Sequence, residues 1–397
     1  MSRFVTLLAA IFLALWDQSA SATGFNGVYV WGGYLSGYSG AAAVQQSVGY
    51  ALARGWNTVR IAITPSEMST EGITSQCATP SLACYAQIEF ASGVWDNQNL
   101  QRVILTLQDF TCYQDGYVTG DANRGCLYAP DLASEQTAIE AEYTNLLNEL
   151  QTRFGSRNIQ FVLDNWEGDN FAYCGGAFAF GQTASVAASC QANFPSGQTN
   201  AQRAAALVQW VGYRDAAVAS FVAANPSFNV ISALQFNSMT LFCQQSTHVA
   251  ATCQTTTSGC NGYCNPSTDT VLDQIAAAGG RTYCDYSSYD SLNNDALPTD
   301  VVNILSRGCS KLILGEVGAL GQAADGSTPA VAQATINQQI CTADSETNVL
   351  GSVIWNLINP GSGPYWGLYT TSGAPMNIGA YGGTCLFPAA PAAALWK

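Results

Sequence analysis

The sequence predicts an α/β protein, a (β/α)8 TIM barrel that forms a single domain. Two observations predict it. Eight short apolar runs alternate with stretches of helical periodicity, which is the order of a parallel sheet with helical connections. Two of these runs end in a glutamate, and in this fold the carboxyl ends of the strands carry the functional side chains. With 397 residues, 48% of them hydrophobic and 10% charged, the chain can bury one large core.

The first 22 residues have the pattern of a secretory signal peptide. Arg3 supplies a positive charge, Phe4 to Trp16 form an apolar stretch, and Ser19 to Ala22 are the small residues of a cleavage site. The apolar stretch is too short to span a bilayer comfortably. We therefore expect a secreted protein in which residues 23–387 form the barrel and residues 388–397 a loose tail.

Each expected strand is a short apolar run. In chain order the eight are Gly24–Trp31, Thr58–Ile63, Arg102–Phe110, Asn158–Trp166, Asn229–Phe236, Thr282–Tyr289, Ser310–Gly315 and Gly351–Ile358. The expected helices between them are Ala41–Arg54, Leu132–Phe154, Ala201–Ala224, Thr270–Ala278, Asp300–Arg307 and Pro329–Asp344. A polar, cysteine-rich insertion is expected around residues 238–270. This alternation predicts parallel strands closed into a barrel.

A doubly wound open sheet is the alternative fold. It would favour a glycine-rich phosphate loop after the first strand. The sequence there, Gly32-Gly33-Tyr34 followed by Gly37, is not a G-x-G-x-x-G motif, so the barrel is favoured.

Charge and residue types exclude several classes of function. The formal charge is −14 and the only lysines are Lys311 and Lys397, so the surface repels nucleic acid and anionic membranes. The single histidine, His248, argues against a Ser-His-Asp triad, and no phosphate-binding loop or histidine-rich metal motif occurs. We expect no metal, no cofactor and no nucleic-acid or membrane partner, and a monomeric protein.

Fourteen cysteines in an exported chain predict disulfides before metal ligands. Ten of them lie in segments that follow expected strands: Cys77, Cys84, Cys112, Cys126, Cys174, Cys190, Cys243, Cys253, Cys260 and Cys264. Pairing within each loop is the simplest hypothesis. Disulfides would then staple the loops on the face where the strands end.

Two of the ten glutamates terminate apolar runs, Glu167 and Glu316. The others fall on a helix, where a solvated face is expected, or in and around loop-like sequence: Glu135, Glu140, Glu142, Glu149, Glu67, Glu71, Glu89 and Glu346. Glu167 and Glu316 could each be a buried carboxylate paired with Arg60, but burying two without a use is expensive. Paired carboxylates on a rigid scaffold can cleave glycosidic bonds.

These residues resemble clan A of the retaining glycoside hydrolases. The resemblance rests on an asparagine and a glutamate at the end of strand four, on Gly-Glu-x-Gly at residues 315–318, and on Trp355 in strand eight. It implies an O-glycosyl hydrolase of the EC 3.2.1 type that uses a double-displacement mechanism. In that case Glu167 is the general acid/base and Glu316 the nucleophile.

The resemblance also implies supporting roles. Arg60 would hold Glu316 ionised, Asn165 would bind the sugar 2-OH, and Trp355 would form the floor of the sugar site. An aromatic hydroxyl from strand six, Tyr289 or else Tyr286, would contact Glu316. The clan has the asparagine and glutamate adjacent, whereas here Trp166 intervenes, so a bulge or an early strand end is needed to place both side chains.

Aromatic and amide side chains near the strand ends predict a carbohydrate partner, because sugars stack apolar faces on rings and present hydroxyls to polar groups. The aromatic candidates are Trp31, Tyr34, Phe110, Tyr113, Tyr117, Trp166, Phe171, Tyr173, Trp355, Tyr365 and Trp366. The polar candidates are Gln108, Asp109, Asp169, Asn170, Gln235, Asn237 and Asn356.

Two other functions remain open from sequence: a catalytically inactive, secreted carbohydrate-binding barrel, and a disulfide-rich secreted interaction protein. Geometry separates them from a retaining hydrolase. Its carboxyl groups should lie roughly 5–5.5 Å apart, whereas inversion needs roughly 6.5–9.5 Å. Glu167 should carry a proton through a raised pKa, and Glu316 should be ionised beside Arg60.

Overall fold

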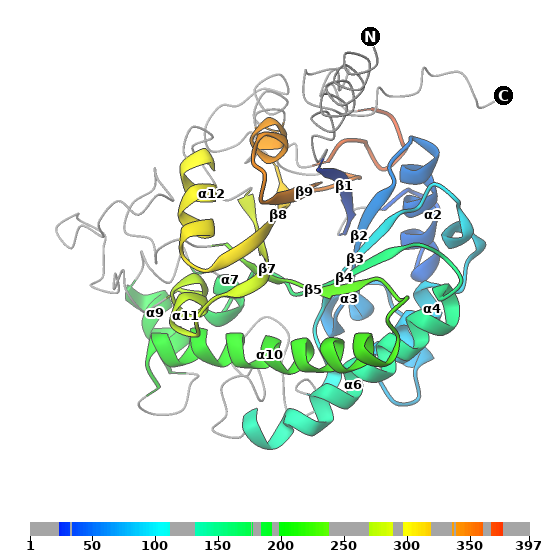
Figure 1. The fold of residues 1–397 in the computed structure, drawn as a ribbon. Helices are drawn as coiled ribbons and strands as arrows, with labels where there is room; N and C mark the ends of the chain where they lie inside the picture. Colours follow the sequence, from blue (N-terminus) through cyan, green and yellow to red (C-terminus); the bar gives the residue numbers. More distant parts are fainter. Residues whose placement is uncertain are drawn as a thin grey trace, which may run out of the picture.

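A parallel β-sheet surrounded by helices forms the centre of the molecule (Figure 1). The structure is a computed structural model. It describes residues 24–31, 34–111, 132–175, 177, 184–192, 198–237, 270–288, 297–318, 336, 339–359 and 367–375. The expected signal peptide, nearly all of the insertion and the C-terminal tail lie outside these residues.

The sheet contains nine strands in the order β5-β4-β3-β2-β1-β9-β8-β7-β6. They are β1 (Phe25–Val30), β2 (Thr58–Ile63), β3 (Arg102–Leu107), β4 (Gln160–Asp164), β5 (Val230–Ser232), β6 (Leu234–Phe236), β7 (Arg281–Tyr286), β8 (Cys309–Val317) and β9 (Val349–Ile354). The two outermost strands, β5 and β6, are halves of one expected strand separated by Ala233. The sheet therefore closes on itself, and the predicted (β/α)8 barrel is confirmed.

The helices cover the outside of the barrel. They are α2 (Ala41–Ala53), α3 (Pro65–Thr70), α4 (Leu82–Glu89), α6 (Leu132–Phe154), α7 (Gly168–Ala172), α9 (Ala184–Gln191), α10 (Asn200–Ala224), α11 (Val271–Ala277) and α12 (Leu297–Ser306), with 3-10 turns η1 (Thr74–Gln76) and η2 (Gly93–Asp96). The last expected helix is described over 339–345, and these residues are helical. No helix within the described ranges is long and apolar enough to cross a membrane.

Four helices were not expected from sequence: α3 and α4 after β2, and α7 and α9 after β4. Two of them have recognisable N-terminal signals. The Thr64 hydroxyl accepts the Glu67 N–H at 3.1 Å, with Pro65 as the first helical residue, and the Ser81 hydroxyl accepts the Cys84 N–H at 3.3 Å. These caps fold the segment after β2 into helices.

Period-two alternation along the strands separates two cores. One side of each strand packs against the helices, as Val59 and Ile61 of β2 do. The other side fills the barrel interior with a smaller cluster: Tyr29, Ala62, Ile104, Val162, Ala233, Ile313, Val353 and Trp355. Two residues beyond Ile104 and Val162, the interior positions become polar with Thr106 and Asp164. The carboxyl end of the barrel is therefore chemically different from its middle.

Disulfides fasten both the loops and the sheet. Cys77 pairs with Cys84 and Cys174 with Cys190, as predicted for pairing within loops. A third bond, Cys284–Cys309, was not predicted and joins β7 to β8 inside the core. Cys112, Cys126 and the cysteines of the insertion lie outside the described residues.

Burial corrects the expectations for several glutamates. Glu142 of α6 does not lie on a solvated face; its carboxylate accepts backbone N–H groups of Leu82 at 3.1 Å, Phe110 at 2.9 Å and Thr111 at 3.0 Å. It thereby holds the chain after β3 and the start of α4 against α6. The glutamates after β2 are also buried: Glu67, Glu71 and Glu89.

Candidate active site

Arg60 lies at the centre of the polar end of the barrel. It is fully buried on β2, and its Nε donates to the Thr106 hydroxyl at 2.7 Å. Its Nη1 lies 3.1 Å from Asp285, and its Nη2 lies 3.6 Å from Asp164 and 3.8 Å from Glu316. One guanidinium therefore contacts carboxylates from three other strands.

Glu167 follows β4 after a sharp change of direction. The strand ends at Asp164, so the early strand end that the intervening Trp166 required is present. The Glu167 N–H donates to the Gln235 side-chain oxygen at 2.8 Å. A Cβ at Gly168 would lie 2.6 Å from Leu207 and 2.7 Å from the Gln235 carbonyl oxygen, so only glycine fits there. This close approach fixes the backbone beside Glu167.

Glu316 lies near the end of β8 with a φ of 59°, a conformation that non-glycine residues rarely adopt. The pairing of β8 with β9 shifts register at this point. The preceding Gly315 donates its N–H to Asp285 at 2.9 Å, and a Cβ there would lie 2.1 Å from the same carboxylate. Asp285 therefore packs directly against the strand that presents Glu316.

The hydroxyl of Ser287, just after β7, joins the two glutamates. It lies 3.1 Å from Oε1 of Glu167 and 2.9 Å from Oε2 of Glu316. These two oxygens can therefore be no farther apart than 6.0 Å, the two distances laid end to end. Both glutamates are 1% exposed. The sequence prediction that they lie face to face is met by the fold.

Burial and the neighbouring charge decide the protonation of this pair. Burial raises the pKa of Glu316 well above its usual value, Glu167 raises it further, and Arg60 lowers it. The sequence instead predicts an ionised Glu316 beside Arg60. The difference arises because burial and Glu167 outweigh Arg60, which lies closer to Asp285 and Asp164 than to Glu316. Burial and the nearby carboxyl group therefore favour the protonated form of Glu316.

Asn165 makes contacts that close the barrel. Its Nδ2 donates to the Gln235 carbonyl at 2.9 Å, and its Oδ1 accepts the Gln235 N–H at 3.1 Å. The side chain thus links the end of β4 to β6 just past the break at Ala233. Asn170 is the amide that donates to Glu167. The contact of Asn165 with a sugar 2-OH stays a prediction.

Trp31 and Trp355 lie against each other at the ends of β1 and β9. Their rings are 4.7 Å apart, and the Tyr29 ring lies 5.0 Å from Trp355. Tyr29 donates to Thr106 at 2.8 Å, and the Arg60 guanidinium lies 4.8 Å from the centre of its ring. These three rings, the aromatic floor, therefore contact Arg60 through Tyr29.

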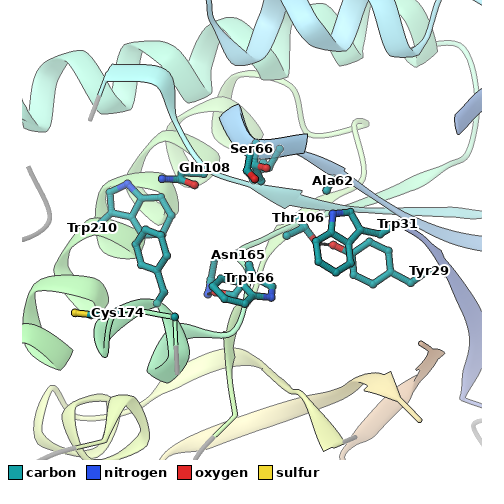
Figure 2. Close-up of a pocket in the computed structure, with 14 residues that line it drawn as sticks. Tyr29, Trp31, Ala62, Ser66, Thr106, Gln108, Asn165, Trp166, Cys174 and Trp210 are labelled. Atoms are coloured by element: carbon teal, nitrogen blue, oxygen red, sulfur yellow. Dashed lines mark hydrogen bonds between the residues drawn. The ribbon is translucent and has the colours of Figure 1, made fainter. Parts of the chain in front are cut away.

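A cavity of about 440 Å³ opens beside this floor (Figure 2). Figure 2 shows Tyr29 and Trp31 on one side of it, Trp210 on the opposite side, and Asn165 and Trp166 between them. Its walls are mostly aromatic, or polar without charge, with Ala62, Leu107, Cys174 and Gly175 between them: Tyr29, Trp31, Trp166, Phe171, Trp210, Thr64, Ser66, Thr106, Gln108 and Asn165. Glu167 and Glu316 are not in its lining, but Trp166 directly precedes Glu167. The cavity therefore adjoins the carboxyl pair.

Asp109 and Asn237, two other predicted site residues, support the walls. The Trp210 indole N–H donates to Asp109, which fixes that ring at the cavity. Asn237 accepts the Asn170 N–H at 3.1 Å and donates its own N–H to Asp169 at 3.2 Å. These bonds tie the end of β6 to α7, which carries the amide that contacts Glu167.

The contact expected between a tyrosine hydroxyl and Glu316 stays a prediction. The hydroxyl of Tyr286 donates to Asp300 of α12 at 3.2 Å, away from Glu316. Tyr289 lies outside the described residues, as do Tyr113, Tyr117, Tyr365 and Trp366. Ser287 contacts Glu316 instead.

Sequence reasoning missed Ser287, Asp285, Thr106 and Tyr29. Three of them had a usable signal, because a polar or large aromatic residue on the interior side of a barrel strand stands out once the alternation is assigned. Ser287 had none. Across the part of the chain that the structure describes, no group of three or more histidine, cysteine, aspartate or glutamate side chains could hold a metal ion.

Comparison with known proteins supports the fold. No protein-family model and no curated protein matches the chain. Solved structures do match. A GH5_18 protein from Streptomyces cattleya, in complex with GlcNAc, is 14% identical with a TM-score of 0.51, covering 89% of this chain and 77% of that one. A β-glucosidase from Thermotoga maritima, in complex with deoxynojirimycin, is 10% identical with a TM-score of 0.51, covering 90% and 95%. The chain therefore has the (β/α)8 fold of these two proteins, as the sequence predicts.

Proposed function

We propose that the protein is a glycoside hydrolase that cleaves O-glycosidic bonds with retention of configuration. The observation that carries the proposal is the pair Glu167 and Glu316, whose bridged oxygens are at most 6.0 Å apart. Two carboxyl groups that contact the same hydroxyl lie close together, which favours the roughly 5–5.5 Å separation of retention over the roughly 6.5–9.5 Å of inversion.

In the proposed mechanism the two glutamates have different roles. Glu316 attacks the anomeric carbon as a carboxylate, while Glu167 gives its proton to the departing oxygen. Glu167 then removes a proton from the water that hydrolyses the glycosyl-enzyme. Arg60 supplies positive charge beside Glu316, at 3.8 Å, as that group ionises. The Asn170 amide contacts Glu167 and orients it.

The substrate class we propose is a neutral oligosaccharide or polysaccharide. The cavity beside the carboxyl pair offers indole rings for the apolar faces of a sugar, and hydroxyl and amide groups for its hydroxyls. None of the described side chains that line it is charged, so among them a uronic acid or an amino sugar would find no counter-charge. We also propose that the protein acts outside the cell. The signal-like first 22 residues and the disulfides support this location.

A panel of glycans tests the proposal. We expect release of sugar from at least one neutral glycan, with NMR showing that the product first appears with the anomeric configuration of the substrate. Initial appearance of the opposite anomer would contradict retention. Binding to glycans without release would favour the inactive carbohydrate-binding barrel, and no binding at all would favour an interaction protein.

A further inference from the structure

Ser287 occupies an unusual position for a serine, between two buried carboxyl groups. It is fully buried, and its hydroxyl oxygen lies 3.1 Å from Glu167 and 2.9 Å from Glu316. Both distances are hydrogen-bond distances. The next residue, Ser288, is equally buried but turns its hydroxyl to Gln339 at 2.9 Å. Only the first of these neighbouring serines faces the carboxyl pair.

A serine hydroxyl carries one hydrogen, whereas an ionised carboxylate carries none. Ser287 can therefore donate to one glutamate only. The second contact is a hydrogen bond only if the other glutamate is protonated and donates to the serine oxygen. The two distances thus fit a pair that holds one proton, arranged as acid, hydroxyl and carboxylate in a chain.

We infer that Ser287 is a positioning residue that holds Glu167 and Glu316 in a singly protonated state and passes the shared proton from Glu316 to Glu167. The transfer is balanced. Glu316 gives its proton to the serine oxygen while the serine gives its own proton to Glu167, so the serine stays neutral and Glu316 becomes the carboxylate. This inference rests on the proposed function, because only that reaction requires the proton on Glu167.

The charged and titratable groups around the pair are consistent with one shared proton. Arg60 of β2 faces Glu316 at 3.8 Å, but it also contacts Asp164 of β4 and Asp285 of β7. Tyr29 of β1 lies beneath the guanidinium and remains neutral, since burial raises its pKa well above its usual value. Burial likewise raises the pKa of Glu316, as do the charge of Glu167 and a direct side-chain hydrogen bond with it, whereas the Ser287 hydroxyl lowers it. One cation, Arg60, thus serves three carboxyl groups. It does not balance the charge of Glu167 and Glu316 when both are ionised, so the state with one proton on the pair is favoured.

The test is Ser287→Ala, compared with wild type in two measurements. The first is a pH titration of the side-chain carboxyl signals of carbon-13-labelled glutamate, assigned with Glu167→Gln and Glu316→Gln. The second is the pH profile of kcat on a neutral glycan. Loss of the bridging hydroxyl should bring the two apparent pKa values of the pair closer together, by roughly one unit at each end. The active pH range should narrow from both sides by the same amount.

Two further variants serve as controls. Ser287→Thr retains the hydroxyl and should restore the width of the profile, and Ser288→Ala removes the neighbouring buried hydroxyl and should leave the width unchanged. A merely structural role would lower kcat or stability without narrowing the profile. Unchanged titration of the pair in Ser287→Ala would overturn the inference. If wild type cleaves no glycan, the proposed function fails while the titration still decides what Ser287 does.

Discussion

The protein contains two groups of buried carboxyl side chains, which differ in what lies beside them. The first group surrounds Arg60, whose guanidinium contacts Asp164, Asp285 and Glu316. The second lies where α3 and α4 meet and contains Glu67, Glu71 and Glu89. The hydroxyl of Tyr34 donates to Glu67 and lies 3.3 Å from Glu71.

In the second group the carboxyl groups are neutralised mainly by protonation rather than by a cation. The side chains of Glu71 and Glu89 share a hydrogen bond, which raises the pKa of Glu89 and lowers that of Glu71. Burial raises the pKa of Glu71 to about 7, and burial together with Glu71 raises the pKa of Glu89 to about 10. The comparison teaches that a fixed cation opposes the effect of burial on an acid, as Arg60 lowers the raised pKa values of Glu316 and Asp285. Without such a cation it stays neutral and contributes a pH-dependent term to stability.

The largest expected effect is that of Glu316→Gln. The amide cannot attack the anomeric carbon, so turnover of a neutral glycan should fall by about 10⁴-fold or more. Initial rates measured with the variant and with Glu135→Gln, a change on the outer helix α6, check this. Comparable rates for Glu316→Gln and wild type would show that Glu316 is not the nucleophile.

Glu167→Ala should slow turnover by about 10² to 10⁴-fold, because a general acid and base is lost while the nucleophile remains. Azide can enter the space left by the side chain and attack the glycosyl-enzyme. Addition of azide should therefore raise the rate and yield a glycosyl azide of retained configuration. Absence of rescue together with an unaltered rate would show that Glu167 is not the acid/base.

Arg60→Leu tests the first group through stability. Removal of the guanidinium leaves Asp164, Asp285 and Glu316 buried without their shared cation, which should lower the free energy of unfolding by about 3–5 kcal/mol. The loss should be larger at pH 8 than at pH 5, because the remaining carboxyl groups can take up protons in acid. Urea unfolding at both pH values measures it. Lys311→Met, which removes a cation whose Nζ donates to Asn348, is the control.

The sequence allowed the barrel and the central pair to be predicted because both depend on local patterns. Alternation along each strand places Arg60 inside and Val59 outside, and the apolar runs before Glu167 and Glu316 bring both to the same end. These properties follow from period two and parallel order.

The remaining details depend on contacts between residues far apart in sequence. Ser287 meets Glu167 across 120 positions, and Asn165 meets Gln235 across 70. Glu71 and Glu89 lie 18 positions apart, and their side chains meet in the fold. No local pattern contains such distances, which explains why the sequence predicts a solvated or loop position for residues that the fold buries.

The smallest expected effect is that of Glu89→Gln. A raised pKa of Glu89 in the folded protein means that folding favours its protonated form. In acid, where Glu89 is protonated in both the folded and the unfolded state, it therefore does not lower the free energy of unfolding. As the pH rises above the unfolded-state pKa of about 4.3, Glu89 lowers the free energy of unfolding, and this loss grows until the pH reaches the folded-state pKa of about 10. Glutamine keeps the neutral shape of the acid at every pH. The variant should therefore unfold like wild type near pH 4 and be more stable at pH 9, by on the order of 1–3 kcal/mol. Urea unfolding across this range, with Glu149→Gln of α6 as control, should show a gain confined to Glu89. An equal gain in the control, or a loss at high pH, would mean that Glu89 is ionised in the folded protein and that the two groups of acids do not differ as described.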